Sequence, residues 1–238
     1  MVLAERATQT EMPRAERPPR RARSGPSRAL KPVVFAVSCL PLVKLAIDAA
    51  RGDLTANPIA EVMNRFGFWT ITFLVASLAI SPAKTLFGWT SPARVRRMVG
   101  LFAFFYASAH FLTYLALDQA FDFGDIGKDI VKRKFITVGF AAFLLLVPLA
   151  ATSFDRAVKA LGFRRWKRLH RLAYGAAVLG IVHFVWRVKA DLLVPSVFGA
   201  ILAFLFAVRL VDYFRAKKAR ARPRAEPAPH AGRAPAAR

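Results

Sequence analysis

Apolar and charged residues are sorted into long alternating blocks along the central part of the chain. Runs of roughly 15 to 20 apolar residues alternate with short charged stretches, without the single-residue alternation that is typical of strands. A helix that crosses about 30 Å of hydrocarbon needs roughly 17 to 25 residues, so these runs predict membrane-spanning helices. Six spans are expected, at residues 33–50, 68–86, 98–117, 135–151, 172–188 and 192–211. The predicted fold class is therefore all-α, a polytopic membrane bundle of six transmembrane helices.

The two ends of the chain differ from this centre in composition. The 238 residues are 55% apolar and yet carry a formal net charge of +23, much of which lies at the ends. Residues 1–32 hold 8 Lys and Arg against 3 Asp and Glu, and residues 215–238 hold 8 against 1. Segments of this composition bury too little apolar surface to offset their ordering entropy. We expect a disordered basic tail at 1–32, a transmembrane domain at 33–214 and a second disordered basic tail at 215–238.

The charge between the spans predicts how the bundle is oriented. Residues 84–97 carry four Lys and Arg and residues 153–171 carry seven, on the same side as both tails. The opposite loops are less positive, with Asp53 and Glu61 in the first and four Asp residues, at 118, 122, 125 and 129, in the second. Lys132, Arg133 and Lys134 at the end of the second loop are an exception. By the positive-inside rule, both termini are expected in the cytoplasm. Because the charge is sorted by membrane side and not gathered in a groove, membrane lipids are expected partners and nucleic acid is not.

Motifs that the sequence lacks narrow the chemistry. Cys39 is the only cysteine, which excludes an internal disulfide, a cysteine-ligated iron–sulfur cluster and a C-x-x-C-H haem attachment site. Any haem is then held non-covalently. No G-x-G-x-x-G or Walker-type loop occurs, so no built-in nucleotide-binding domain is expected. Lys44 and Asp48, one turn apart in the first span, are interpreted as a snorkelling ion pair in preference to part of a proton path.

Two of the four histidines lie at matched depth in spans that run in the same direction. His110 follows Arg97 by 13 residues and His183 follows Arg171 by 12. At about 1.5 Å per residue, both imidazoles lie roughly 18 to 20 Å from the cytoplasmic edge. Two neutral imidazoles at one level of a bundle are what a low-spin b-type haem requires as axial ligands, so we expect a haem between the third and fifth spans. A lone buried histidine would more often hydrogen-bond to a neighbour, but a matched pair favours ligation.

The residues on the same helix faces suit a flat ring. Small residues, Ala176 and Gly180, share a face with His183 and leave room beside it. Tyr106 and Tyr114 share a face with His110 and are candidate cofactor contacts. Arg187 lies one turn beyond His183, where it is a candidate partner of a haem propionate.

His170 opens the fifth span about 20 Å below His183 and has no histidine opposite it. The corresponding position on the third span is occupied by Arg96 or Arg97. Three interpretations stay open: a histidine at the membrane interface, a ligand of a second haem with an unidentified partner, or a contact to flavin or quinol.

Several stretches resemble the MsrQ (YedZ) family, the membrane haem subunits of the bacterial methionine sulfoxide reductase system MsrPQ. They are RRMVGLFAFFYASAHFLTY at 96–114, RKFITVGF at 133–140, LGFRRWKRLHRLAYGAAVLGIVHFVWRVK at 161–189, and the loop NPIAEVMNRFGFW at 57–69. The resemblance covers roughly residues 40–210. Its W-x-x-L-H-R-x-x-Y element makes Trp166 and Arg171 candidate cofactor contacts beside His170.

The resemblance implies more than the spacing does. The family belongs to the ferric reductase-like transmembrane superfamily, whose two haem-bearing helices each carry two histidines; here the fifth span has both and the third only one. It implies b-type haem and FMN, electrons from the quinone pool, and delivery to MsrP, a periplasmic molybdopterin enzyme that reduces methionine sulfoxide in oxidised envelope proteins. It also implies a location in the bacterial inner membrane.

The predicted function is that of an electron-transfer subunit, with the reduction of methionine sulfoxide left to a partner. The absence of a nucleotide domain agrees with this, since the chain then needs another protein or quinol as its donor. Two alternatives stay open at this point: a haem-containing ferric or other metal reductase, and a small non-haem membrane transporter.

Overall fold

The computed structural model describes residues 29–88, 95–188 and 190–221, and this part of the chain is helical without strands. The prediction of an all-α membrane bundle is confirmed, because six helices within the described ranges are long and apolar enough to cross a membrane. Most of each predicted tail lies outside the described residues. In chain order the helices are α1 (Leu30–Arg51), α2 (Pro58–Phe87), α3 (Arg96–Thr113) with a π-helical turn (Tyr114–Asp118), α4 (Phe123–Lys132), α5 (Lys134–Ala151), α6 (Asp155–Leu161), α7 (Phe163–Leu169), α8 (Leu172–Arg187) and α9 (Leu193–Ala221).

Two helix boundaries differ from the predicted spans by ten residues. The helix α2 begins at Pro58 instead of residue 68, because the side chain of Asn57 caps it by accepting from the backbone N–H of Ala60 at 3.0 Å. The helix α9 continues to Ala221, past the predicted span end at 211 and past the predicted domain boundary at 214. Polar residues extend both helices beyond the apolar run that identified them.

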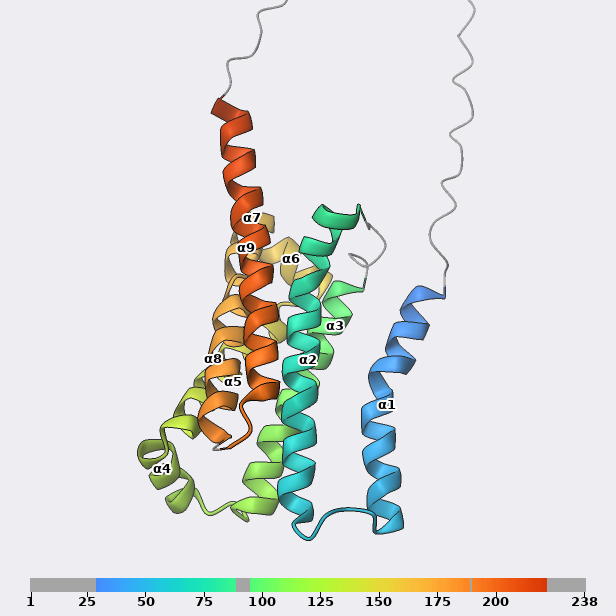
Figure 1. Ribbon diagram of the computed structural model, residues 1–238, viewed down its shortest axis with the longest axis vertical. Coiled ribbons are helices and arrows are strands. Elements are labelled where there is room, and N and C mark those ends of the chain that lie inside the picture. The colour runs from blue at the N-terminus through green and yellow to red at the C-terminus, as the bar shows by residue number, and fades with distance from the viewer. Residues whose placement is uncertain (1–28, 89–94, 189, 222–238) are drawn as a thin grey trace, which may run out of the picture.

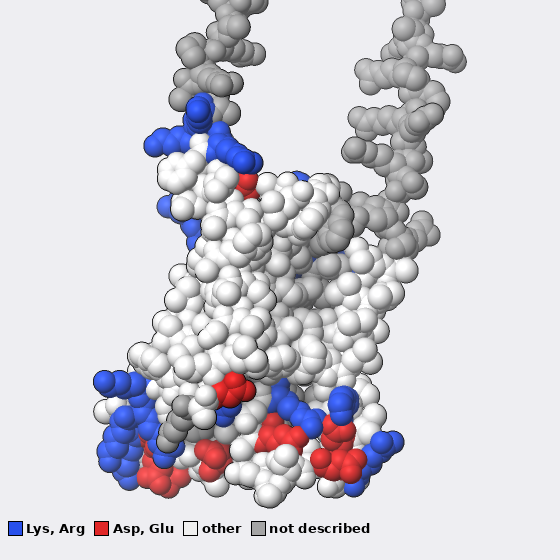
Figure 2. All heavy atoms as spheres, viewed as in Figure 1, with Lys and Arg blue, Asp and Glu red and all other residues white. Residues whose placement is uncertain are grey.

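The ends of the bundle differ in the elements that they carry (Figure 1). The start of α1 and the end of α9 lie at the same end as α6 and α7, and the α1–α2 connection and α4 lie at the opposite end. We call these the α6–α7 end and the α4 end. On the face drawn in Figure 2, Lys, Arg, Asp and Glu lie at the two ends, and a belt free of them runs between. This belt is where the hydrocarbon of a membrane would lie.

Two antiparallel helix pairs, α2 with α3 and α5 with α8, form the centre of the bundle. Small side chains are buried in it, including Ala103, Ala107, Ala176 and Ala177. Without large side chains at these positions the backbones approach closely, which is how transmembrane helices pack in lipid. The helix α1 stands to one side (Figure 1) and is joined to α3 by a hydrogen bond from the Tyr106 hydroxyl to the carbonyl of Ser38, 2.8 Å long.

Candidate functional site

His110 and His183 face one another across the centre of the bundle. His110 comes from α3 and His183 from α8, and their ring centroids are 6.1 Å apart with the ring planes crossed at 82°. A cavity of about 330 Å³ contains both rings and is walled by α2, α3, α5 and α8. Its walls are mainly apolar and aromatic, with Phe68, Phe111, Phe140, Phe143 and Phe184 among the lining side chains. The sequence-predicted pair is therefore brought together in one site.

A backbone carbonyl fixes each imidazole from behind. The Nδ1 of His110 donates to the carbonyl of Met63 in α2 at 2.8 Å, and the Nδ1 of His183 donates to the carbonyl of Phe135 in α5 at 2.7 Å. Since a carbonyl oxygen only accepts, the proton of each neutral ring is on Nδ1. Nε2 then keeps its lone pair and is available to a metal, as in metal-binding histidines that are oriented by a second hydrogen bond.

The separation of the two rings fits a single metal between them. Two metal–imidazole bonds of about 2 Å each, and roughly 1 Å from each bonding nitrogen to its ring centroid, add up to about 6 Å between centroids. The observed 6.1 Å agrees with this sum. The residues present thus fit a bis-histidine haem iron in both separation and tautomer.

Two arginines and a tyrosine line the cavity toward the α4 end. Arg187 and Tyr114, both predicted from the sequence, are among its lining residues. Arg133, which the spacing argument did not single out, lines it as well and pairs with Asp129 at 3.1 Å. The Tyr114 hydroxyl contacts the same carboxylate at 3.5 Å. The cationic groups among the described lining residues therefore lie on one side of the cavity, which is what the two propionates of haem require.

Tyr106 lies elsewhere, although it shares a turn with His110. Its side chain is fully buried and its ring stacks on Phe73, with centroids 5.4 Å apart and planes 10° apart. Its hydroxyl points to α1, where it donates to Ser38. Tyr106 does not line the cavity, and its contacts are those of a packing residue.

The remaining predicted residues gather near the α6–α7 end. The ring of His170 lies 4.0 Å from that of Trp166, and its Nδ1 donates to the Trp166 carbonyl at 3.1 Å. Its Nε2 is buried without a hydrogen-bond partner in the described part of the chain. The Trp166 indole donates to the Thr152 carbonyl at 3.0 Å, and Arg171 directly precedes α8. None of the three lines the cavity that holds His110 and His183.

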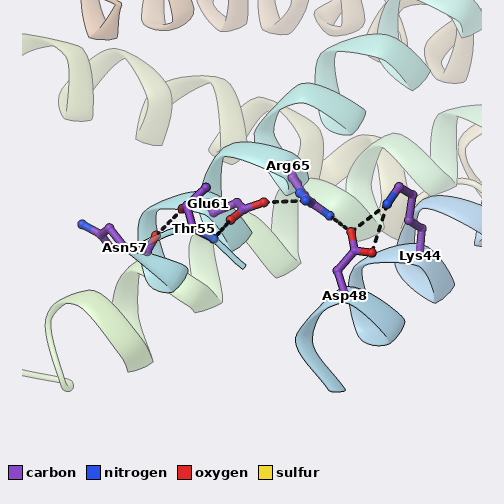
Figure 3. A network of polar contacts seen from close by, with 6 residues as sticks. All are labelled: Lys44, Asp48, Thr55, Asn57, Glu61 and Arg65. Carbon is purple, nitrogen blue, oxygen red and sulfur yellow. Dashed lines mark hydrogen bonds and ion pairs between the residues drawn. The ribbon is translucent and has the colours of Figure 1, made fainter. Parts of the chain in front are cut away.

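A polar network ties α1 to α2 at the α4 end (Figure 3). The predicted Lys44–Asp48 pair is present, with Nζ–Oδ distances of 3.0 and 2.8 Å. The network goes further than the sequence indicated, since Arg65 of α2 pairs with both Asp48 and Glu61. The Glu61 carboxylate also accepts from the backbone N–H of Thr55, so a single chain of contacts spans the α1–α2 connection. A cation shared between two helices holds α1 at this end.

Sequence reasoning missed the two carbonyls that orient the histidines, because residue type does not mark a backbone acceptor. A signal was nevertheless present. The dipeptide Gly-Phe at 67–68 precedes the His-Phe of His110 by 43 residues, and the Gly-Phe at 139–140 precedes that of His183 by 44. The α2–α3 and α5–α8 pairs thus repeat one glycine and one histidine at nearly the same spacing.

Comparison with known proteins agrees with this geometry. The family model described as ferric reductase like transmembrane component matches residues 37–181. The chain is 55% identical over 185 residues to the protein-methionine-sulfoxide reductase heme-binding subunit MsrQ of Rhodospirillum rubrum, covering 78% of this chain and 89% of that protein. It is 48% identical to the MsrQ protein of Herminiimonas arsenicoxydans, over 76% of this chain and 84% of the relative. The chain therefore belongs to the MsrQ family of ferric reductase-like transmembrane proteins.

Proposed function

We propose that this chain is the haem-binding membrane subunit of a methionine sulfoxide reductase system, with a b-type haem between His110 and His183. The observation that carries the proposal is the pair of facing imidazoles, 6.1 Å apart, whose Nδ1 atoms both donate to carbonyls. The MsrQ relatives are named as heme-binding subunits, which supports the same cofactor here.

Each part of the cavity has a role in holding this group. The Nε2 atoms of His110 and His183 would hold the haem iron, and Arg187 and Arg133 would pair with the propionates. Tyr114 lies beside these arginines and restrains Asp129, the carboxylate that also holds Arg133. The aromatic walls surround the site with apolar surface, which lowers the local dielectric around a bound group. When bound, haem supplies one-electron transfer, which none of these side chains provides.

The proposed direction of electron flow follows from the orientation of the chain. We assign the bacterial inner membrane, with both termini and the basic α6–α7 end in the cytoplasm. The cavity, close to the α4 end, then lies near the periplasmic surface. Electrons would come from the quinone pool and pass to an MsrP-like periplasmic molybdopterin enzyme, which performs the reduction of methionine sulfoxide. The chain itself is an electron-transfer subunit and not the catalytic reductase.

A second cofactor site is proposed near the α6–α7 end. The buried Nε2 of His170, which lacks a hydrogen-bond partner among the described residues, supports a role as a ligand of a second haem. Trp166 and Arg171 lie beside it in the chain and are the proposed further contacts. FMN is proposed as an additional cofactor on the family resemblance alone.

Visible spectroscopy tests the haem proposal. Detergent-purified protein is reduced with dithionite, and the reduced-minus-oxidised spectrum is recorded for the wild type, His110→Ala, His183→Ala, His170→Ala and, as a matched control, His230→Ala in the C-terminal tail. Sharp b-type bands are expected in the wild type and the control and are lost in the first two variants. The haem content of His170→Ala sets the number of haems. A wild type that stays colourless when expressed with ample haem contradicts the proposal.

The partner is tested separately with the reduced wild-type protein. Addition of an MsrP-like enzyme together with a methionine sulfoxide peptide is expected to reoxidise the haem completely. The enzyme without the peptide is expected to reoxidise it only until the cofactor of the enzyme is itself reduced. Rapid reoxidation by ferric citrate, with none by the enzyme and peptide, would instead support a metal reductase.

A further inference from the structure

A glycine lies directly against each of the two facing imidazoles. A Cβ atom added to Gly67 of α2 would lie 3.2 Å from both Nδ1 and Cε1 of His110. A Cβ atom added to Gly139 of α5 would lie only 2.5 Å from Nδ1 and 2.7 Å from Cε1 of His183. Both distances at Gly139 are shorter than real Cβ atoms show, so even alanine at position 139 forces the ring of His183 or its surroundings to move.

The position of each glycine explains how the ring reaches its carbonyl. Each glycine lies four residues after the acceptor, Gly67 after Met63 and Gly139 after Phe135. Side chains of a helix point back toward its N-terminus, so the side chain at i+4 covers the carbonyl of residue i. Glycine at that position leaves the carbonyl open, and the imidazole occupies the resulting notch. The same arrangement occurs on both helix pairs, with the ring, glycine and carbonyl in the same relation.

We infer that Gly67 and Gly139 are positioning residues that hold the two axial imidazoles with their planes crossed. This rests on the proposed haem between His110 and His183. The glycine notch restrains the Nδ1–Cε1 edge of the ring, and the carbonyl holds Nδ1 by a hydrogen bond. Together the two contacts leave each ring one orientation about its bond to a metal. The two orientations differ by 82°.

The angle between the planes has an electronic consequence. Each imidazole donates π density into the iron d orbital that lies perpendicular to its own plane. Two iron d orbitals can accept this density. Parallel rings both act on one of them and separate the two in energy, whereas crossed rings act on one orbital each and leave the two nearly equal in energy. Second-shell contacts that rotate a ligand therefore tune a haem without changing its ligands. Electron paramagnetic resonance (EPR) separates the cases, since parallel rings give three resolved lines and crossed rings a single broad low-field feature.

The experiment compares three alanine variants within transmembrane helices. Gly139→Ala and Gly67→Ala fill the two notches, and Gly100→Ala in α3, with nothing within 4 Å of its added Cβ, is the matched control. Alanine favours the helix over glycine in all three, so loss of helix cannot explain an effect. Low-temperature EPR spectra of the oxidised proteins are recorded, with haem content measured on the same samples.

The wild type and Gly100→Ala are expected to give the single low-field feature. Gly139→Ala is expected to convert it to a three-line spectrum or to lose the low-spin signal. Gly67→Ala, with the longer contact, is expected to shift the same feature by less. If Gly139→Ala loses haem altogether, the Gly67→Ala spectrum decides.

Three results overturn the inference. A haem-loaded wild type with a three-line spectrum shows that the planes are not crossed. Spectra of Gly139→Ala and Gly67→Ala that match the wild type show that the glycines do not set the planes. A wild type without haem overturns the proposed function itself, and the inference with it.

Discussion

Both ends of the bundle hold a part-buried imidazole, but among the described residues only the imidazole at the α4 end faces another. There, His110 and His183 come from two helices, and the carbonyls that orient them belong to two more. At the α6–α7 end, His170 donates to Trp166, four residues earlier in its own segment, and its Nε2 has no partner in the described residues. A ligand pair requires four helices in register, whereas a lone oriented histidine requires only one turn. The presence of a histidine in a span is thus a weaker indication of a site than its support by neighbouring helices.

The charged contacts at the two ends differ in the same way. At the α4 end, Arg65 bridges two largely buried carboxylates on two helices. At the α6–α7 end, Arg97 pairs with Asp155 where both side chains are largely exposed, and Arg209 of α9 donates to the Tyr174 hydroxyl and the Leu78 carbonyl without a carboxylate. We therefore expect substitutions at the α4 end to have the larger effects.

The largest effect is expected from removing one ligand and then supplying it from solution. His183→Ala should lose the low-spin haem spectrum, and added imidazole should restore it by filling the space left by the side chain. His170→Ala should retain the low-spin spectrum of the α4-end haem without imidazole. Visible spectra of the variants, titrated with imidazole, measure this. If His170→Ala also loses the low-spin spectrum and added imidazole restores it to the same extent, the distinction between the two ends is removed.

The second effect concerns the attachment of α1. Arg65→Ala leaves Asp48 and Glu61 close together without their shared cation, and we expect Tm in detergent to fall by several degrees. Lys44→Ala is the matched control, because Lys44 contacts the same Asp48 but its side chain is 72% exposed, and its Tm should stay near that of the wild type. Equal drops in the two variants would mean that burial does not distinguish these contacts.

Hydropathy alone predicted the six spans, because the apolar run that crosses a membrane is encoded locally. It placed the start of α2 ten residues late, since Glu61 and Arg65 read as loop residues when their pairing with Asp48 on another helix is unknown. The depth of His110 and His183 could likewise be counted along the chain. The notches at Gly67 and Gly139 could not be predicted, because a glycine leaves room for an imidazole only if the helix that carries the histidine packs beside it.

Tyr106 illustrates the same limit. Periodicity correctly puts it one turn from His110, but one helix face is wide enough to contact two neighbours, and only the assembled bundle decides which. In the structure the Tyr106 side chain turns to α1 and Phe73 instead of the cavity.

The third prediction uses this placement of Tyr106. Tyr106→Phe keeps the ring stacked on Phe73 and removes the buried hydrogen bond to Ser38, which should cost about 1 kcal/mol of unfolding free energy. Tyr114→Phe, which removes only the 3.5 Å contact to Asp129, is the control and should cost less. Thermal unfolding measures both, and the visible spectrum of Tyr106→Phe should match the wild type. A changed haem spectrum in Tyr106→Phe would return this residue to the site.

The smallest effect is expected at the α6–α7 end, for the pair between Arg97 and Asp155. The hydrogen bond from Arg97 lowers the pKa of Asp155 below its ordinary value of 3.8. A carboxyl whose pKa is lowered by folding stabilises the folded state at pH values above its ordinary pKa. This stabilisation is lost as the pH falls through the lowered pKa. Because the two side chains are 44% and 82% exposed, water and salt screen the pair. Asp155→Asn should therefore leave Tm at pH 7 almost unchanged, and high salt should remove what difference exists. A drop comparable to that of Arg65→Ala would contradict the view that the Arg97–Asp155 pair is weak because it is exposed.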